Sequence, residues 1–250
     1  MSTIAVTGSA SGIGLAVRRK LEARGDRVIG VDRHRAEVCA DLSSPQGRAE
    51  AAASVLELAS GVLDGLAVFA GVGPYLDPSL QARVNYFASV GMLSALRPAL
   101  ESGTAASAVV ASSIAATCAP FDPALVQAML AGDEEESVAL IDDAGVAYAS
   151  AKRALACHVR RSAPDWIGSG VRLNAIAPGS TNTPLMDATM ADPMWRERTE
   201  SIPVPAGRFA EADEIAGAVA WMLDAENTYL VGAFLVVDGG TDALVRPDQF

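Results

Sequence analysis

Short apolar runs and longer amphipathic segments alternate along the chain. Residues 3–7 form a run of small and β-branched residues, whereas the apolar positions of 15–24 recur at helical spacing. Further short apolar runs follow, and most of them are separated by segments long enough to form a helix. Seven strands are predicted on this basis, over residues 3–7, 27–31, 36–40, 65–71, 107–111, 171–176 and 234–237, with helices over 15–24, 45–60, 78–100 and 211–223 and a further helix around residue 148.

This alternation predicts an α/β fold, with a doubly wound, seven-stranded parallel sheet and helices on both faces. In such sheets a ligand binds beyond the carboxyl ends of the strands. The residues with the most distinctive chemistry lie at those predicted ends: Gly8, Asp32, Asp41, Gly71, Ser113 and Pro178. We therefore expect one site along that edge of the sheet.

A glycine-rich turn joins the first predicted strand to the first predicted helix. It reads Gly8-Ser-Ala-Ser-Gly12-Ile-Gly14, with the spacing Gly-x-x-x-Gly-x-Gly. Glycines let the backbone approach a pyrophosphate closely, and the free N–H groups at the start of a helix form an anion site. Because the turn stands between a strand and a helix, it predicts a nucleotide site.

Acidic residues end the next two predicted strands. Asp32 lies about 20 residues beyond the glycines, where a carboxylate binds the ribose 2′-hydroxyl of a dinucleotide. A carboxylate there repels a 2′-phosphate, so NAD is favoured over NADP, although the neighbouring Arg33 offers a partner for that phosphate. Asp41 and Leu42 follow the third predicted strand and are placed to border the adenine.

Tyr148 and Lys152 lie four residues apart in a predicted helix. Side chains at this spacing share one face of the helix. An ammonium beside a phenol favours the phenolate, and we expect it to draw the tyrosine pKa from about 10 toward neutrality, where acid–base catalysis works best. The alternative is a half-buried tyrosine and a surface lysine without a catalytic role.

Composition excludes several other functions. The formal net charge of −11 argues against binding to nucleic acid or to acidic membrane surfaces. The three cysteines are far apart and lack the spacing of metal ligands, so no metal site is expected and a reducing compartment is indicated. The apolar run 4–6 is too short for a signal peptide, and no stretch has transmembrane length. We expect a cytoplasmic protein.

These motifs together resemble the short-chain dehydrogenase/reductase family, in its order and over the whole chain. The resemblance rests on the glycine turn, Asn85, Ser113, Tyr148-x-x-x-Lys152 and Pro178-Gly179. It implies one Rossmann-type domain, 1–250, that binds NAD and interconverts an alcohol and a ketone. One departure is Val68-Phe69-Ala70-Gly71, where many members have Asn-Asn-Ala-Gly. The expected cofactor-binding residues are Gly8, Ser11, Gly12, Ile13, Gly14, Asp32, Asp41, Leu42, Ala70, Gly71, Tyr148, Lys152, Pro178, Gly179, Thr181 and Thr183.

The resemblance also implies a catalytic set of Asn85, Ser113, Tyr148 and Lys152. Tyr148 would exchange a proton with the substrate oxygen, and Ser113 would donate a hydrogen bond to that oxygen. Ser112 is an alternative for the serine role. Asn85 would hold a water that relays protons to Lys152, or would only satisfy backbone groups. Thr183 would touch the nicotinamide carboxamide.

Two further features resemble the bacterial 3α-hydroxysteroid dehydrogenase/carbonyl reductase branch of the family, and less closely the coniferyl-alcohol dehydrogenases. They are a long interval between Ser113 and Tyr148 and the tail after Asp238. The extra residues, 119–145, are expected to form two short helices with the acidic run 133–136 as a solvated turn between them. Such helices would cover the usual tetramer interface, so we expect a homodimer formed through another surface. Residues 180–205 are expected to form a mobile substrate loop.

Three other functions are compatible with the sequence. The first is an NADP-linked carbonyl or 3-oxoacyl-carrier-protein reductase with the same catalytic set. The others are a regulator that binds a nucleotide without catalysis and a purely structural interaction protein.

Overall fold

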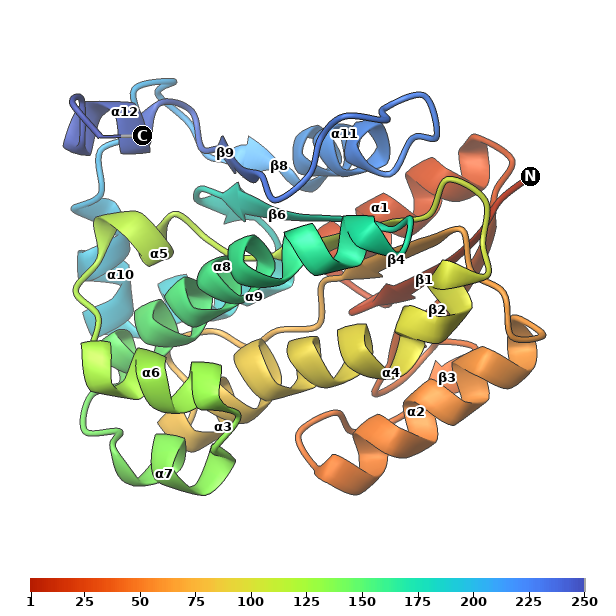
Figure 1. The fold of residues 1–250 in the computed structure, drawn as a ribbon. Coiled ribbons are helices and arrows are strands. Elements are labelled where there is room, and N and C mark those ends of the chain that lie inside the picture. The colour runs from red at the N-terminus through yellow and green to blue at the C-terminus, as the bar shows by residue number, and fades with distance from the viewer. Residues whose placement is uncertain (250) are drawn as a thin grey trace.

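Seven parallel strands form one central sheet in the computed structural model, which describes residues 1–249 (Figure 1). The strand order β3-β2-β1-β4-β5-β6-β9 confirms the predicted doubly wound sheet. Two predicted strands are shorter than expected: the third has two residues, and the fourth ends at Val68. The strands are β1 (Thr3–Thr7), β2 (Arg27–Asp32), β3 (Val38–Cys39), β4 (Gly65–Val68), β5 (Ser107–Ala111), β6 (Arg172–Pro178) and β9 (Phe234–Val237).

Helices cover both faces of this sheet (Figure 1). Side chains alternate between the faces along a strand; in β1, Ile4 and Val6 contact one core cluster and Ala5 the other. The first cluster packs under α1 (Gly12–Ala23) and α11 (Ala212–Met222), and the second under α2 (Pro45–Leu58), α4 (Ser89–Glu101) and α8 (Ala144–Gly168). Strands buried on both sides explain the continuous apolar runs of the sequence.

The predicted long helix 78–100 is built from three parts. It starts as α3 (Pro78–Ala82), passes through a π-helical segment, η1 (Arg83–Ala88), and continues as α4. The π-helical segment contains Asn85, which is fully buried. The polar residue that interrupts this apolar helix in the sequence therefore lies where the backbone geometry changes. A local π-helical segment often marks a functional site.

The insertion between β5 and α8 is helical, as predicted. After α5 (Ala115–Cys118) come α6 (Pro123–Ala131), which packs on α8, and α7 (Glu134–Ala139), which packs against α3. Leu125 and Met129 of α6 are 1% and 0% exposed, so this helix contributes to the core.

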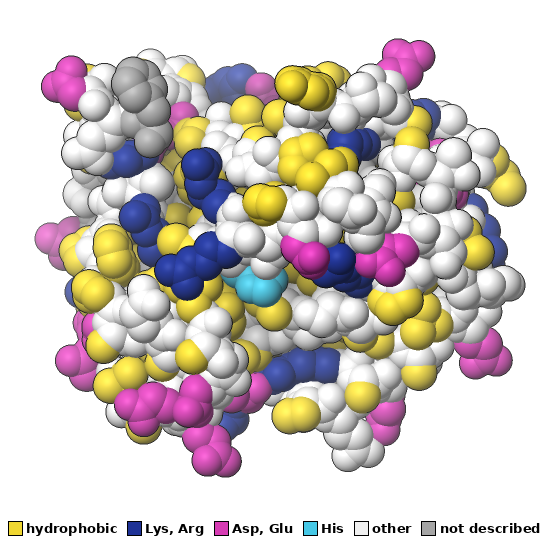
Figure 2. Space-filling view, in the orientation of Figure 1, with side chains coloured by type: hydrophobic (Ala, Val, Ile, Leu, Met, Phe, Trp, Pro, Cys, Tyr) yellow, Lys and Arg dark blue, Asp and Glu magenta, His cyan; other side chains and the backbone are white. Residues whose placement is uncertain are grey.

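The acidic run of the insertion is not the predicted solvated turn. Asp133 caps α7 by accepting the N–H of Glu136 at 2.9 Å. Glu134 lies in the first turn and pairs with Arg48 at 2.8 Å and Arg83 at 3.4 Å. Negative charge stabilises the positive end of a helix, so the acidic run favours the start of α7. The ion pairs of Glu134 also connect α7 to α2 and η1. Figure 2 shows acidic side chains gathered at this corner.

The prediction of a loop over residues 180–205 is also wrong. The segment holds β7 (Thr181–Asn182), which pairs with β8 (Ala210–Glu211), and the helices α9 (Pro184–Ala191) and α10 (Pro193–Glu200). Each proline occupies the first position of its helix, after a capping residue, Thr183 or Asp192. Proline is well tolerated there because that N–H has no helical partner.

The remaining C-terminal segment forms α12 (Thr241–Val245). In the part of the chain that the structure describes, none of these helices combines the length and the apolar character needed to cross a bilayer.

Candidate active site

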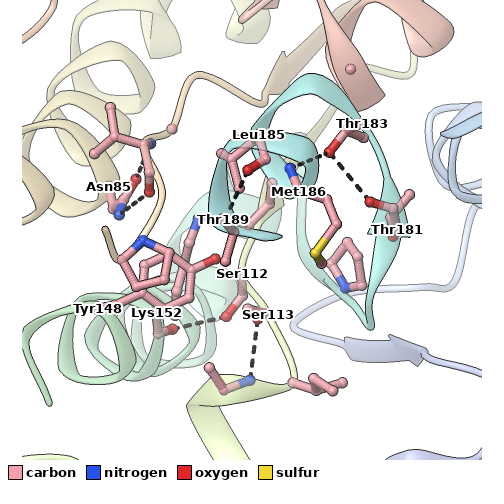
Figure 3. Close-up of a pocket in the computed structure, with 18 of the residues that line it drawn as sticks. Asn85, Ser112, Ser113, Tyr148, Lys152, Thr181, Thr183, Leu185, Met186 and Thr189 are labelled. Carbon is pink, nitrogen blue, oxygen red and sulfur yellow. Dashed lines mark hydrogen bonds between the residues drawn. The ribbon is translucent and has the colours of Figure 1, made fainter. Parts of the chain in front are cut away.

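A cavity of about 960 Å³ opens beyond the carboxyl ends of the strands, where a doubly wound sheet binds its ligands. Every residue that the sequence singled out for catalysis or cofactor binding lines this cavity. These residues are dispersed from Gly8 to Thr183 along the chain, and the sheet topology brings them together. Figure 3 shows how some of them lie around Tyr148 and Lys152.

The glycine turn forms one wall of the cavity. Gly8 has a φ of +71°, and a Cβ there would lie 2.7 Å from the backbone of Phe69 and Ala70. A side chain at Gly14 would lie 2.2 Å from the carbonyl oxygen of Gly8. Glycine is therefore required at both positions. α1 begins between them, at Gly12, and its first residues line the cavity, where the start of a helix offers an anion site.

Two carboxylates line the adjoining part of the cavity. Asp32, at the end of β2, accepts the N–H of Ala10 at 3.0 Å and that of Arg33 at 2.7 Å, which fixes its orientation. Asp41 accepts the N–H of Ser43 at 2.9 Å. Hydrogen bonds from Ser43 lower the pKa of Asp41, with a smaller contribution from Arg33. Both groups are therefore acceptors suited to an adenosine moiety.

The residues so far fit a dinucleotide. The glycines let the turn pack tightly against backbone, so that the turn itself lines the cavity where a pyrophosphate would lie, and Asp32 presents a fixed carboxylate where a ribose hydroxyl would lie. The cavity continues from this wall to Tyr148 and beyond, so a nicotinamide ring and a substrate can meet inside it.

Tyr148 and Lys152 project from one face of α8 into the cavity (Figure 3). Lys152 is 6% exposed, and its Nζ lies 5.8 Å from the centroid of the Tyr148 ring. Nζ donates a hydrogen bond of 2.8 Å to the carbonyl of Ala111, at the end of β5. This bond holds the ammonium beside the phenol.

Burial dominates the acid–base properties of this pair. Desolvation raises the pKa of Tyr148, against an opposing hydrogen bond with Ser113. Desolvation also lowers the pKa of Lys152 to about 8. The structure thus differs from the expectation that the lysine draws the tyrosine pKa toward neutrality, because a buried phenolate loses more hydration than the neighbouring ammonium replaces.

The two serines after β5 have different positions. Ser112 is 4% exposed, and its hydroxyl donates to the carbonyl of Lys152 at 2.8 Å. Ser113 lines the cavity beside Tyr148, and its Oγ accepts the N–H of Ala115 at 3.1 Å. The Ser113 hydroxyl can then donate its hydrogen to the Tyr148 oxygen, which is the bond that opposes the rise of the Tyr148 pKa, or to the oxygen of a bound substrate. Ser112 instead joins the end of β5 to the backbone of α8.

Asn85 faces the same centre from η1. Its Oδ1 accepts the N–H of Val72 at 2.9 Å, and its Nδ2 donates to the carbonyl of Val72 at 3.1 Å. A Cβ on Gly71 would lie 3.1 Å from Asn85 Oδ1 and 3.8 Å from Lys152 Nζ. The Asn85 amide therefore satisfies backbone groups, which is one of the two roles that the sequence suggests. The other role, a water that relays protons between Asn85 and Lys152, stays a prediction.

The segment after β6 closes the cavity over the glycine turn. The Thr183 hydroxyl accepts the N–H of Met186 at 3.2 Å and donates to the carbonyl of Thr181 at 3.3 Å (Figure 3). A Cβ on Gly12 would lie 3.4 Å from Thr183 Cγ2, so this threonine packs against the glycine turn. The predicted carboxamide contact of Thr183 would compete with these two bonds.

Sequence reasoning missed the residues of the outer cavity. They come from α9, from α10 and the residues directly after it, and from the C-terminal segment, and they include Leu185, Met186, Trp195, Arg198, Ile202 and Val245. The capped prolines that start α9 and α10 were the only signal of ordered structure here. No motif marked the individual side chains, because a substrate pocket is defined by shape and not by residue spacing.

Comparison with known proteins gives consistent matches over the full chain. A 3-alpha-hydroxysteroid dehydrogenase/carbonyl reductase of Comamonas testosteroni is 43% identical over 100% of both chains. A coniferyl-alcohol dehydrogenase of a Pseudomonas species is 33% identical over 95% of each. The crystal structure of a Pseudomonas 3-alpha-hydroxysteroid dehydrogenase complexed with NADH superposes with a TM-score of 0.96, at 45% identity and full coverage of both chains. A family model described as enoyl-(acyl carrier protein) reductase matches residues 133–242.

Proposed function

Because this chain belongs to the short-chain dehydrogenase/reductase family, we propose that it is an NAD(H)-dependent oxidoreductase that interconverts a secondary alcohol and a ketone. The observation that carries the proposal is the convergence of Tyr148, Lys152 and Ser113 in a cavity that also contains the glycine turn and Asp32. A nucleotide-binding regulator or a structural protein has no use for this catalytic set.

Tyr148 is the proposed acid and base. Its hydroxyl would take the proton of an alcohol during oxidation and return it to a carbonyl oxygen during reduction, a role typically worth about 10²–10⁴-fold in rate. NAD, held along the glycine turn and by Asp32, would supply the hydride chemistry. Ser113 would donate a hydrogen bond to the same substrate oxygen, on which negative charge develops.

Lys152 would support the phenolate form of Tyr148. With a pKa of about 8, the lysine is mostly protonated at neutral pH, and its bond to Ala111 keeps the charge in place. Lys152 would also bind the ribose next to the nicotinamide. Asn85, through its contacts with Val72 and its proximity to Lys152, would position the lysine and the proposed relay water.

Asp32 supports NAD as the preferred cofactor. Its carboxylate is fixed by two backbone N–H groups and would accept hydrogen bonds from the ribose hydroxyls. A 2′-phosphate would meet that negative charge. Arg33 also lines the cavity, which leaves an NADP-linked reductase as the second candidate.

Hydroxysteroids and related bulky cyclic alcohols are the proposed substrates. Two of the full-length matches are described as 3-alpha-hydroxysteroid dehydrogenases. The outer cavity supports this choice, because apolar side chains such as Leu185 and Ile202 offer contacts to a fused ring system. A panel of steroid, aromatic and aliphatic alcohols, assayed with NAD by NADH absorbance, tests it. Turnover of short aliphatic alcohols but not of steroids would contradict the proposal.

The chain is further proposed to be a single domain and a cytoplasmic homodimer. One continuous sheet supports the single domain, and three free cysteines support a reducing compartment. For the dimer we propose the surface of α11 and the edge strand β9. Trp221 on α11 is 53% exposed, and β9 lies at the end of the sheet with all four residues partly exposed. A second copy would cover both.

A further inference from the structure

The outer cavity contains a cation that the proposed chemistry does not use. Arg198 lies in the last turn of α10 and lines the cavity. Its guanidinium lies over the indole ring of Trp195, 4.8 Å from the ring centroid. Trp195 is only 8% exposed and is therefore a firm platform. Stacking of this kind holds a guanidinium in place while its N–H groups stay free to bind a ligand.

Arg198 also lies beside the helix that carries Tyr148. A Cβ on Gly145 would lie 3.0 Å from Arg198 Nη1 and 3.1 Å from the Trp195 ring, so the absence of a side chain makes room for the stacked pair. Gly145 precedes Tyr148 by three residues, about 4.5 Å along the helix axis. The guanidinium therefore lies beside the first turn of α8, and Tyr148 projects from a later turn of this helix into the same cavity.

Most other charges in the cavity already have partners or roles. Asp32, Arg33 and Asp41 surround the adenosine end, and Lys152 lies at the reacting centre. Asp143 caps α8 through two backbone N–H groups. Within residues 1–249, no carboxylate forms an ion pair with Arg198. Arg198 is an exposed residue that lines the cavity. Asp143 Oδ1 lies 3.1 Å from the same point beside Gly145, but it already accepts two backbone N–H groups, so the guanidinium can bind an anionic group of a ligand.

We infer that Arg198 binds a carboxylate carried by the alcohol substrate at the end remote from its reacting hydroxyl, an inference that rests on the function proposed above. A guanidinium binds a carboxylate through two parallel hydrogen bonds, which fix orientation as well as affinity. The apolar body of the substrate would lie between Trp195 and the side chains of Leu185 and Ile202. A net charge of −11 repels acids in general, so a local cation at this place would favour a substrate carboxylate.

The test compares two substrates that differ only in charge, a 3-hydroxysteroid with a side-chain carboxylate and its primary amide. The measured quantity is the ratio of kcat/KM for the acid to kcat/KM for the amide. In Arg198→Gln this ratio is expected to fall at least about tenfold through the KM of the acid, because a charge-assisted hydrogen bond is lost. Arg198→Lys, which keeps the charge, is expected to lie between the wild type and this variant.

Arg196→Gln is the matched control, because it removes the same charge from α10 at a residue whose guanidinium bonds the carbonyl of Met190 outside the cavity. It should leave the ratio unchanged. An unchanged ratio in Arg198→Gln, or an equal fall in both variants, would overturn the inference.

Calorimetric titration of the acid into the wild type and into Arg198→Gln, each with NADH present, measures binding without turnover. We expect at least about tenfold weaker binding in the variant. Equal affinity of the acid for the wild type and for Arg198→Gln would overturn the inference, even if the enzyme oxidises neither steroid. If the variant binds the acid more weakly but the wild type oxidises neither steroid, only the proposed function is contradicted.

Discussion

Asn85 binds the backbone of Val72 with both ends of its amide, at 2.9 Å from Oδ1 to the N–H and 3.1 Å from Nδ2 to the carbonyl. The amide is fully buried and lies in the π-helical turn η1. The contact therefore joins this turn to the loop that follows β4, beside Lys152.

Asn85→Leu should consequently reduce stability as well as activity. It leaves the N–H and the carbonyl of Val72 without their partner, at about 1–3 kcal/mol for each group that stays buried. Urea unfolding of the variant measures the loss, with Asn227→Leu as a control at a half-buried asparagine that makes only one long side-chain hydrogen bond, 3.4 Å to the carbonyl of Trp221. A loss of activity at unchanged free energy of unfolding would show that Asn85 acts only through the proton relay.

Lys152 should make the stability of the protein depend on alkaline pH. Its pKa is about 8 in the folded state and about 10.5 when exposed, so the unfolded chain binds more protons between these values. Stability must then rise with pH through this window, by about 2 kcal/mol from pH 7.5 to 9.5. Lys152→Met lacks this contribution. Equal changes of unfolding free energy with pH in the variant and the wild type would contradict the low lysine pKa.

Lys152→Met should also impair catalysis. The variant lacks the charge that supports the Tyr148 phenolate and the group that would bind the nicotinamide ribose, so both turnover and NAD affinity are expected to fall. Calorimetry with NAD separates the two effects. Undiminished NAD affinity would exclude a ribose contact.

Tyr148→Phe should retain the fold and NAD binding while turnover falls by about 10² or more. The reason is that only the phenolic oxygen is removed, and this oxygen is the proposed partner in the exchange of the substrate proton. Tyr229→Phe, at a tyrosine 99% exposed, is the matched control. Carbonyl reduction by Tyr148→Phe at nearly the wild-type rate would exclude Tyr148 as the acid and base.

The pH dependence of the rate should follow the Tyr148 pKa. Because burial raises this pKa, the protonated phenol persists at neutral pH and favours carbonyl reduction. Alcohol oxidation needs the phenolate and should therefore accelerate as pH rises. Rates of both directions between pH 6 and 10 check this, and an oxidation rate that is flat over this range would contradict it.

Asp32 should make the wild type use NAD at least about tenfold better than NADP, equivalent to about 1.4 kcal/mol. Asp32→Ala should narrow the gap, because it removes the repulsion of the 2′-phosphate and leaves Arg33 nearby. Asp32→Asn tests charge alone, since the shape of the side chain is kept. A wild type that prefers NADP would refute this role of Asp32.

The parts of this fold that depend on local chemistry could be predicted from the sequence. Strand ends, glycines and the Tyr148–Lys152 spacing specify where the sheet binds a ligand, and β9 occurs at the predicted residues. The sequence of residues 180–205 suggests a loop because Pro184 and Pro193 break a helix anywhere except in its first turn. Only the capping residues before them indicate that they start helices. The raised pKa of Tyr148 depends on burial by distant segments, which residue spacing cannot report.

The last prediction concerns assembly. In a two-fold interface a patch meets its own copy, so pairing through the outer face of α8 would bring the exposed Arg160 and Arg161 toward like charges. Trp221→Glu, on α11, should therefore convert a wild-type dimer into monomers, as measured by light scattering.

Ile167→Glu places the same charge on α8, at a residue 40% exposed, and should leave the dimer intact. If Ile167→Glu yields monomers and Trp221→Glu does not, or if the wild type is a tetramer held through α8, the interface lies on the face of α8. That outcome would also mean that α6 and α7, although they pack on α8 and α3, leave enough of this face open for a partner.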